Sequence, residues 1–150
     1  MAFSPGAPIL KSGDLVNWKY IGHSVPRLDF GDPSAYSLDN GKQAYVKGIW
    51  ASSMRYRAST KTWYWIGCVQ SSGKTYIYTA SDPTAKWGLA STINTCYYDC
   101  GILFDDKDDI YVAYGNTKLS VARLNKDLTQ KDTTLVYSAS FYLEGSRMYQ

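Results

Sequence analysis

Short runs of aromatic and β-branched residues, separated by glycine, aspartate and serine turns, extend along most of the chain. Residues 62–69 and 74–80 flank a Ser-Ser-Gly turn, and this arrangement predicts a β-hairpin. The predicted strands span residues 62–69, 74–80, 101–104, 110–115, 119–124, 134–137 and 141–149. No window shows the period of an amphipathic helix, so the pattern predicts an almost entirely β fold.

A faint repeat divides the chain into similar units. Residues 12–18 (SGDLVNW) resemble residues 81–87 (SDPTAKW), and residues 125–128 (NKDL) echo the same place without a tryptophan. Each copy is expected to follow an outer strand, and a Gly-, Asp- and Ser-rich insertion at about residues 27–47 lengthens the first interval. A repeat of roughly 40–50 residues with four short strands is typical of a propeller blade. The sequence therefore predicts a single partial propeller domain over residues 1–150, with about three blades of four-stranded antiparallel sheet.

The composition gives no support for a nucleic-acid or membrane partner, whereas its aromatic residues suit a sugar-binding surface. The formal charge of +3 is mild and no run of Lys or Arg occurs, so no nucleic-acid partner is expected. No stretch approaches the roughly 18 apolar residues of a membrane helix, and the first residues lack the pattern of a signal peptide. The 14 Tyr and 5 Trp suit sugar-binding or interface surfaces, although they are also good strand residues.

The cysteine and histidine content gives no support for a metal site. The sequence has no Cys-x-x-Cys motif, since its cysteines are Cys68, Cys96 and Cys100. His23 is the only histidine in the sequence. Because one of three cysteines must stay unpaired within the chain, we expect buried free thiols and at most one disulfide. The acidic run 105–109 lacks the alternating ligands of a calcium loop and is expected to be a solvated hairpin turn. No metal or other cofactor is therefore predicted.

Two carboxylic acids stand apart from the others, most of which lie beside Gly, Ser, Asn or Lys in predicted turns. Asp99 lies at the start of a predicted strand, and Glu144 lies among aromatic and aliphatic residues. An acid in apolar surroundings tends to pair or to keep its proton, and a protonated carboxyl is what a general acid needs. Together the two acids could hydrolyse a glycosidic bond, or each could be a strand-end residue with a local hydrogen bond.

Four segments, in this order along the chain, resemble the motifs of glycoside hydrolase family 43. They are residues 12–23 (SGDLVNWKYIGH), 48–56 (GIWASSMRY), 98–106 (YDCGILFDD) and 144–149 (EGSRMY). The resemblance implies a five-bladed β-propeller and an inverting enzyme that releases arabinose or xylose from plant cell-wall polysaccharides. It also implies a secreted protein whose partner is an arabinoxylan-type oligo- or polysaccharide.

The resemblance further implies roles for individual residues. Glu144 corresponds to the general acid of the family, and Asp99 to the acid that orients the general acid and tunes its pKa. Trp50 lies where the family has an aromatic residue in the central pocket. Trp50 and Arg147 are therefore expected to bind substrate.

The family's general base is the main departure from the pattern. In the family this aspartate precedes the motif that Asp14 belongs to, but no acid occurs among the residues before Asp14. The segment Asp32-Pro33-Ser34 imitates the base motif, but it follows the first motif and is rejected as the base. We therefore expect the isolated chain to be inactive, with a complementary chain or a self-associated oligomer completing the propeller.

Two other interpretations remain open. The chain could be a non-catalytic module that binds carbohydrate or self-associates, because an open partial propeller exposes strand edges and apolar faces. Alternatively, it could be an intact small β protein that shares these motifs.

Overall fold

Ten strands and two short 3₁₀ helices make up a computed structural model that describes residues 6–36, 39–42 and 48–150. The strands are β1 (Gly6–Ser12), β2 (Trp18–Val25), β3 (Ile49–Arg57), β4 (Thr62–Val69), β5 (Lys74–Ala80), β6 (Gly88–Ile93), β7 (Gly101–Phe104), β8 (Ile110–Tyr114), β9 (Lys118–Leu124) and β10 (Gln130–Ser138). The helices are η1 (Pro33–Tyr36) and η2 (Asp39–Gly41). The prediction of an almost entirely β fold is confirmed, and no helix of the described residues is long and apolar enough to cross a membrane.

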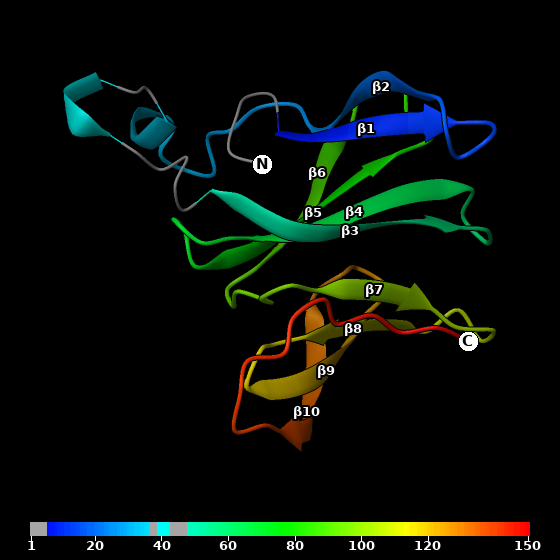
Figure 1. Ribbon diagram of the computed structural model, residues 1–150. Helices are drawn as coiled ribbons and strands as arrows, with labels where there is room; N and C mark the ends of the chain where they lie inside the picture. The colour runs from blue at the N-terminus through cyan, green and yellow to red at the C-terminus, as the bar shows by residue number, and fades with distance from the viewer. Residues whose placement is uncertain (1–5, 37–38, 43–47) are drawn as a thin grey trace.

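The strands form three antiparallel sheets that follow one another along the chain (Figure 1). Two sheets have four strands each, in the orders β3-β4-β5-β6 and β7-β8-β9-β10, and each therefore has the predicted form of a blade. Within the described residues the first sheet contains only β1 and β2. The first strands of the two four-stranded sheets, β3 and β7, contact each other, whereas every residue of β10 is exposed. Each four-stranded sheet thus runs from an inner first strand to an outer fourth strand.

The repeated turns occupy equivalent places in the three sheets. Asp14 Oδ1 accepts hydrogen bonds from the main-chain amides of Val16 and Asn17. Asp82 and Asp127 each accept from the amide and hydroxyl of the threonine two residues later. These turns join β1 to β2, β5 to β6 and β9 to β10. The repeat is real, but the expectation that each copy follows an outer strand is wrong, because each one precedes the last strand of its sheet.

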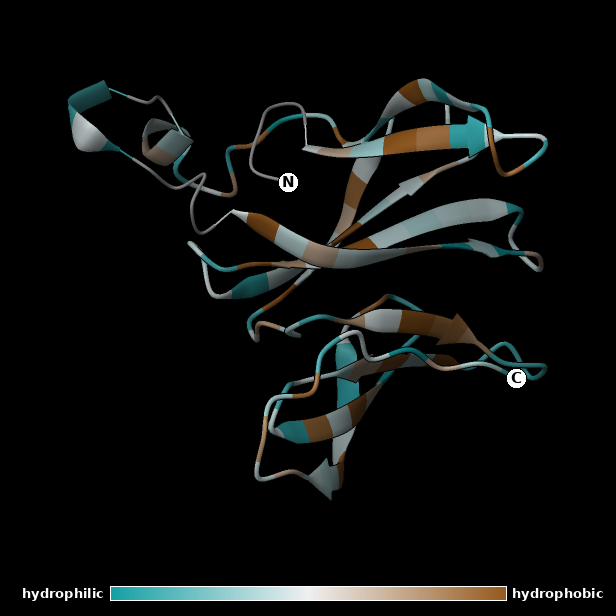
Figure 2. Cartoon of the chain, in the orientation of Figure 1, coloured by the Kyte–Doolittle hydropathy of each residue, from teal (hydrophilic) through white to brown (hydrophobic). Residues whose placement is uncertain are grey.

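The middle sheet is buried on both faces. Along β4, Trp65 packs in a cluster shared with β1 and β2, while the neighbouring Ile66 packs in a second cluster shared with the sheet of β7 to β10. Along β5, Tyr76 and Tyr78 belong to the first cluster and Ile77 belongs to the second. Alternate residues of a strand point to opposite faces, so both positions of the pleat must be apolar here. The outer strand β10, by contrast, is exposed along its whole length, and it is mostly teal and white in Figure 2.

The described part of the insertion at residues 27–47 is anchored in the first cluster. Leu28, Phe30 and Tyr36 are buried there, and the Phe30 ring centroid lies 4.7 Å from that of Tyr76. The Tyr76 hydroxyl donates a hydrogen bond to the Phe30 carbonyl oxygen at 3.3 Å. The described part of the insertion therefore packs against the sheets through its apolar residues.

An ion pair connects the two four-stranded sheets at the end of β3. The buried Arg57 guanidinium donates two hydrogen bonds to the Asp108 carboxylate in the β7–β8 turn, at 2.8 and 2.5 Å. Ser59 Oγ donates a third hydrogen bond to this carboxylate at 2.7 Å. These donors lower the pKa of Asp108 from 3.8 to about 2. The predicted hairpin turn is confirmed, and one of its acids also joins neighbouring sheets.

Removal of the Ile77 side chain is expected to lower the free energy of unfolding by about 2–5 kcal/mol in Ile77→Ala. Ile77 has no exposed surface, so the substitution leaves a cavity between two sheets. Urea denaturation followed by tryptophan fluorescence measures the change. The control is Leu135→Ala on β10, where the side chain is 54% exposed and the expected change is below about 0.5 kcal/mol. Similar losses in the two variants would contradict the two-sided core.

The pH dependence of stability is expected to reveal the Arg57–Asp108 pair. Because the folded-state pKa of Asp108 is depressed from 3.8 to about 2, its contribution is present above about pH 4 and is lost as the pH falls toward 2. In Asp108→Asn the Tm should be lower at pH 7, and the decrease in Tm between pH 4 and pH 2 should be smaller. Thermal unfolding by circular dichroism measures both, with Asp106→Asn in the same turn as the control. An unchanged pH profile in Asp108→Asn would rule out this pair as a source of stability.

Candidate active site

Residues from two neighbouring inner strands meet where β3 and β7 lie side by side. Trp50 lies near the start of β3, and Tyr98 and Asp99 lie in the loop directly before β7. Because these residues lie at, or just before, the start of the inner strand of their sheets, the fold brings them to one region (Figure 1). The predicted site residue Trp50 therefore lies beside Tyr98, which directly precedes the predicted site residue Asp99.

The segment that carries Glu144 returns from the outer strand to β7. After β10, residues 139–150 run back across the last sheet, drawn in red in Figure 1. The main-chain amides of Ala139 and Leu143 donate to the carbonyl oxygens of Thr117 and Asn116, in the β8–β9 loop. These bonds go to a loop and do not form a strand ladder, so the prediction of a strand around Glu144 is wrong.

The Glu144 turn, residues 144–147, is hydrogen-bonded to the loop that carries Asp99. The Tyr98 hydroxyl donates a hydrogen bond to Glu144 Oε1 at 2.8 Å. The next residue, Gly145, donates its main-chain amide to Asp99 Oδ2. The Asp99 carboxylate therefore holds the main chain directly beside Glu144, which sets where the Glu144 side chain begins.

Left-handed backbone conformations and one close approach shape the contact between the Glu144 turn and the loop that carries Asp99. Asp99 has φ 55° and Gly145 has φ 77°, a region in which glycine has no steric penalty. A Cβ atom added to Gly101 would lie only 2.6 Å from the Ser146 carbonyl oxygen. Glycine at position 101 thus allows the Glu144 segment to lie directly against the start of β7.

The surroundings of Glu144 differ from those expected from the sequence. Glu144 is exposed, and its neighbours Phe141 and Tyr142 are 58% and 75% exposed. The expectation of an apolar environment rested on sequence neighbours, but the aromatic side chains extend into solvent and do not cover the carboxyl. The defined partner of the Glu144 carboxyl is the Tyr98 hydroxyl.

Arg147 ties three segments together through main-chain carbonyl groups. Its Nη1 donates to the oxygens of Asp99 and Cys100 at 3.3 and 3.1 Å, and to that of Ser146 at 2.8 Å. Its Nη2 donates to the Ser52 oxygen in β3 at 3.2 Å. A guanidinium used in this way positions the turn between β3 and β7. Substrate binding by Arg147 stays a prediction, and these contacts favour a positioning role.

An aromatic pair borders the carboxyl of Glu144. The Trp50 side chain is exposed over 43% of its surface, and its ring lies 6.2 Å from the Tyr98 ring at an interplanar angle of 62°. Tyr98 was not predicted as a site residue, although its place directly before Asp99 in the third motif was a signal. The hydrogen bond to Glu144 raises the pKa of Tyr98. Exposed aromatic faces with a nearby polar group suit the binding of a sugar ring.

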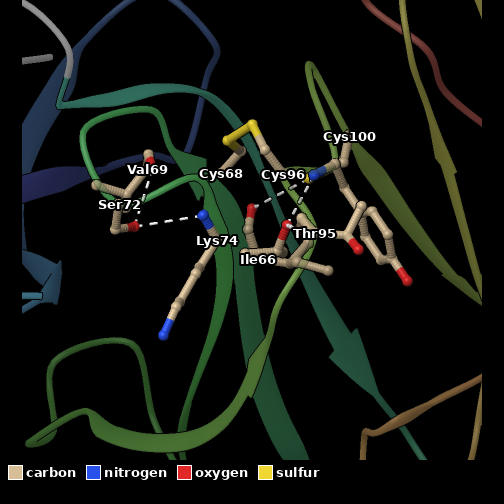
Figure 3. The surroundings of a disulfide bond; sticks show 10 residues. Ile66, Cys68, Val69, Ser72, Lys74, Thr95, Cys96 and Cys100 are labelled. Atoms are coloured by element: carbon tan, nitrogen blue, oxygen red, sulfur yellow. Dashed lines mark hydrogen bonds between the residues drawn. A yellow bond between two sulfur atoms is a disulfide. The ribbon is translucent and has the colours of Figure 1, made fainter.

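A disulfide anchors the loop that presents Tyr98 and Asp99. Cys68 at the end of β4 is bonded to Cys96, which closes a sequence separation of 28 residues (Figure 3). Cys100 is a buried thiol whose Sγ lies 3.9 Å from the Ile66 carbonyl oxygen. Burial raises the pKa of Cys100 to about 12, so it remains a thiol near neutral pH. The expected single disulfide and unpaired thiol are both present.

The other residues considered from the sequence have structural partners. His23 lies in β2, where its Nδ1 is 2.6 Å from the Tyr20 hydroxyl oxygen. Asp32 is exposed just before η1, and its Oδ1 accepts hydrogen bonds from the amide and hydroxyl of Ser34. Within residues 6–36, 39–42 and 48–150, no three His, Cys, Asp or Glu side chains are grouped to hold a metal ion.

The sequence as a whole matches one enzyme family. The profile of the Glycosyl hydrolases family 43 covers residues 1–150. The chain belongs to this family. A family 43 relative, the non-reducing end alpha-L-arabinofuranosidase of Bacteroides ovatus, is 33% identical over 108 residues, which are 69% of this chain and 19% of the relative. The beta-xylosidase of Formosa agariphila is 39% identical over 61 residues, which are 41% of this chain and 10% of the relative.

Solved structures of this family share the fold. One is a GH43 glycoside hydrolase whose engineered active site gives endo-xylanase and exo-arabinofuranosidase activity. It is 45% identical, with a TM-score of 0.88 over 99% of this chain and 31% of that one. A bifunctional GH43-CE protein of Bacteroides eggerthii is 34% identical, with a TM-score of 0.88 over 100% of this chain and 20% of that one. The family 43 chain thus spans less than a third of these proteins and aligns with part of a five-bladed propeller, as predicted.

Loss of the Arg147 guanidinium is expected to loosen the Glu144 turn. In Arg147→Ala the Gly145 amide should exchange with solvent about tenfold faster or more, because several hydrogen bonds that hold the turn are lost. Hydrogen–deuterium exchange with NMR detection measures this rate. Arg123→Ala, which removes a surface ion pair between β9 and β10, is the control and should leave the Gly145 rate unchanged. If Arg147→Ala behaves like the control, Arg147 does not position the turn.

Proposed function

We propose that this family 43 chain supplies the acid side of an inverting glycosidase site that acts on arabinose- or xylose-containing plant cell-wall polysaccharides. The observation that carries the proposal is that the Asp99 carboxylate accepts a hydrogen bond from the main-chain amide of Gly145, the residue directly after Glu144. The arabinofuranosidase and xylosidase names of the relatives support the substrate class. An arabinoxylan-type oligo- or polysaccharide is the proposed partner.

Glu144 is proposed as the general acid and Asp99 as the residue that orients it. The proton of Glu144 would pass to the glycosidic oxygen as the bond to the sugar breaks. In an inverting reaction a second carboxylate activates water on the opposite face of the sugar. Because no acid precedes Asp14 in the sequence, this base is proposed to come from a complementary chain or segment.

Trp50 is proposed as the aromatic surface for the sugar. Its exposed ring lies against Tyr98, whose hydroxyl reaches Glu144, so a pentose on Trp50 would be close to the proposed acid. The ring supplies apolar contact for the sugar face, while nearby polar groups supply orientation. Arg147 would then act mainly through the turn that it holds.

Secretion is part of the same proposal. Plant cell-wall polysaccharide lies outside cells, so an enzyme that degrades it must meet it there. The Cys68–Cys96 disulfide supports this location, because structural disulfides persist mainly in oxidising compartments.

A non-catalytic, self-associating module is the second candidate, and the outer edge of the last sheet favours it. Leu135, Val136 and Tyr137 on β10 are 54%, 63% and 52% exposed, and Phe141 and Tyr142 follow with exposed rings. An exposed edge strand with apolar side chains favours association with another chain. Sedimentation of the purified chain separates the cases, because concentration-dependent self-association without hydrolysis supports the module.

Hydrolysis of aryl arabinofuranosides and aryl xylosides tests the glycosidase proposal. The chain alone is expected to give no turnover above background. Addition of the complementary part of the 45% identical relative should produce turnover, and Glu144→Gln should lower it by about 10²- to 10⁴-fold. Asp32→Asn should leave it unchanged. Turnover that survives Glu144→Gln, or turnover by the chain alone that depends on Asp32, would overturn this assignment.

A further inference from the structure

Tyr98 connects the proposed acid to the aromatic surface. Its hydroxyl donates to Glu144 Oε1 at 2.8 Å, and its ring makes an edge contact with Trp50. A phenol hydroxyl acts here as the donor, so Oε1 is the accepting oxygen. The other carboxyl oxygen, Oε2, is then the atom left to carry a proton.

The loop around Tyr98 is rigidly held on both sides. The Tyr98 amide donates to the Cys96 carbonyl oxygen at 3.0 Å, and the Tyr98 carbonyl accepts from the Gly115 amide at 2.8 Å. Cys96 is bonded to Cys68 in β4. The main chain of Tyr98 is therefore fixed from the β4 side and from the β8–β9 loop, independently of Glu144.

The buried hydroxyl of Thr75 in β5 holds the same loop through two hydrogen bonds. The hydroxyl donates to the Thr95 carbonyl oxygen at 2.7 Å and accepts from the Tyr97 amide at 2.8 Å. Thr75 and Tyr97 have no exposed surface. A side chain carried on a backbone held in this way can orient a reacting group without moving itself.

We propose that Tyr98 is a positioning residue for the acid step, holding Oε1 of Glu144 so that the proton to be transferred sits on Oε2. This inference rests on the proposed function of Glu144. In the step, the Oε2 proton passes to the glycosidic oxygen, the bond between the anomeric carbon and that oxygen breaks, and Glu144 becomes a carboxylate. The Tyr98 hydroxyl keeps its own proton and donates to the carboxylate, which it stabilises more strongly than the neutral acid. Water adds to the sugar and its proton passes to the base.

The contact itself can be tested in the chain without any catalysis. Tyrosine ¹³Cζ NMR measures the pKa of Tyr98, which the hydrogen bond to Glu144 raises above 10.0, with smaller contributions from burial and from the charges of Glu144, Asp99 and Tyr142. Glu144→Gln should lower this pKa, because the charged acceptor is gone. Tyr137→Phe, on exposed β10, is the control and should leave it unchanged. An unchanged Tyr98 pKa in Glu144→Gln overturns the inference.

The effect on the acid step is tested in the complemented enzyme. Tyr98→Phe retains the ring against Trp50 and removes only the hydroxyl. For glycosides with a poor leaving group, which need the proton, kcat should fall about 10- to 100-fold. Dinitrophenyl glycosides have a leaving group that departs without protonation, so their kcat should change less than about twofold. KM should change little for both kinds of substrate. An equal loss on both substrates would mean a structural role and would overturn the inference.

The outcomes distinguish this inference from the proposed function. If Glu144→Gln leaves turnover intact, the proposed function fails whatever Tyr98 does. If Glu144→Gln abolishes turnover of poor leaving groups while Tyr98→Phe does not discriminate between substrates, the function stands and the inference fails.

Discussion

Burial of the β3–β6 sheet on both faces sets the arrangement of the other sheets and of the candidate site. Trp65 and Ile66 are consecutive residues, yet they belong to different clusters because successive side chains of a strand point to opposite faces. The sheet can satisfy both faces only between two other sheets. This stacking places the inner strand β3 beside β7 and so creates the region in which the candidate site lies.

The site itself is assembled mainly through main-chain groups of distant segments. Asp99 binds the Gly145 amide, and Arg147 binds carbonyl groups of β3 and of the residues before β7. Such contacts depend on the path of the backbone more than on neighbouring side chains. They let an exposed segment after β10 hold a defined position without joining a sheet.

One disulfide and one buried hydroxyl hold the same loop. The Cys68–Cys96 disulfide and the Thr75 hydroxyl both act on residues 95–97, directly before Tyr98 and Asp99. A loop that must present two polar side chains at a blade edge cannot be held by apolar packing alone. Covalent and hydrogen-bonded anchors in the core supply the missing constraint.

The β class, the repeated aspartate turns and the family motifs could be predicted from the sequence alone, because these depend on local residue spacing and turn chemistry. The sequence also identified Glu144 and Asp99, whose segments the fold does bring together. The folded structure was needed to show that Glu144 is exposed, that its segment is not a strand, and that Tyr98 is its partner. It also decided which cysteines pair and what Arg147 binds. These features depend on contacts between residues far apart in the chain, and local spacing carries no information about which distant backbone groups will meet.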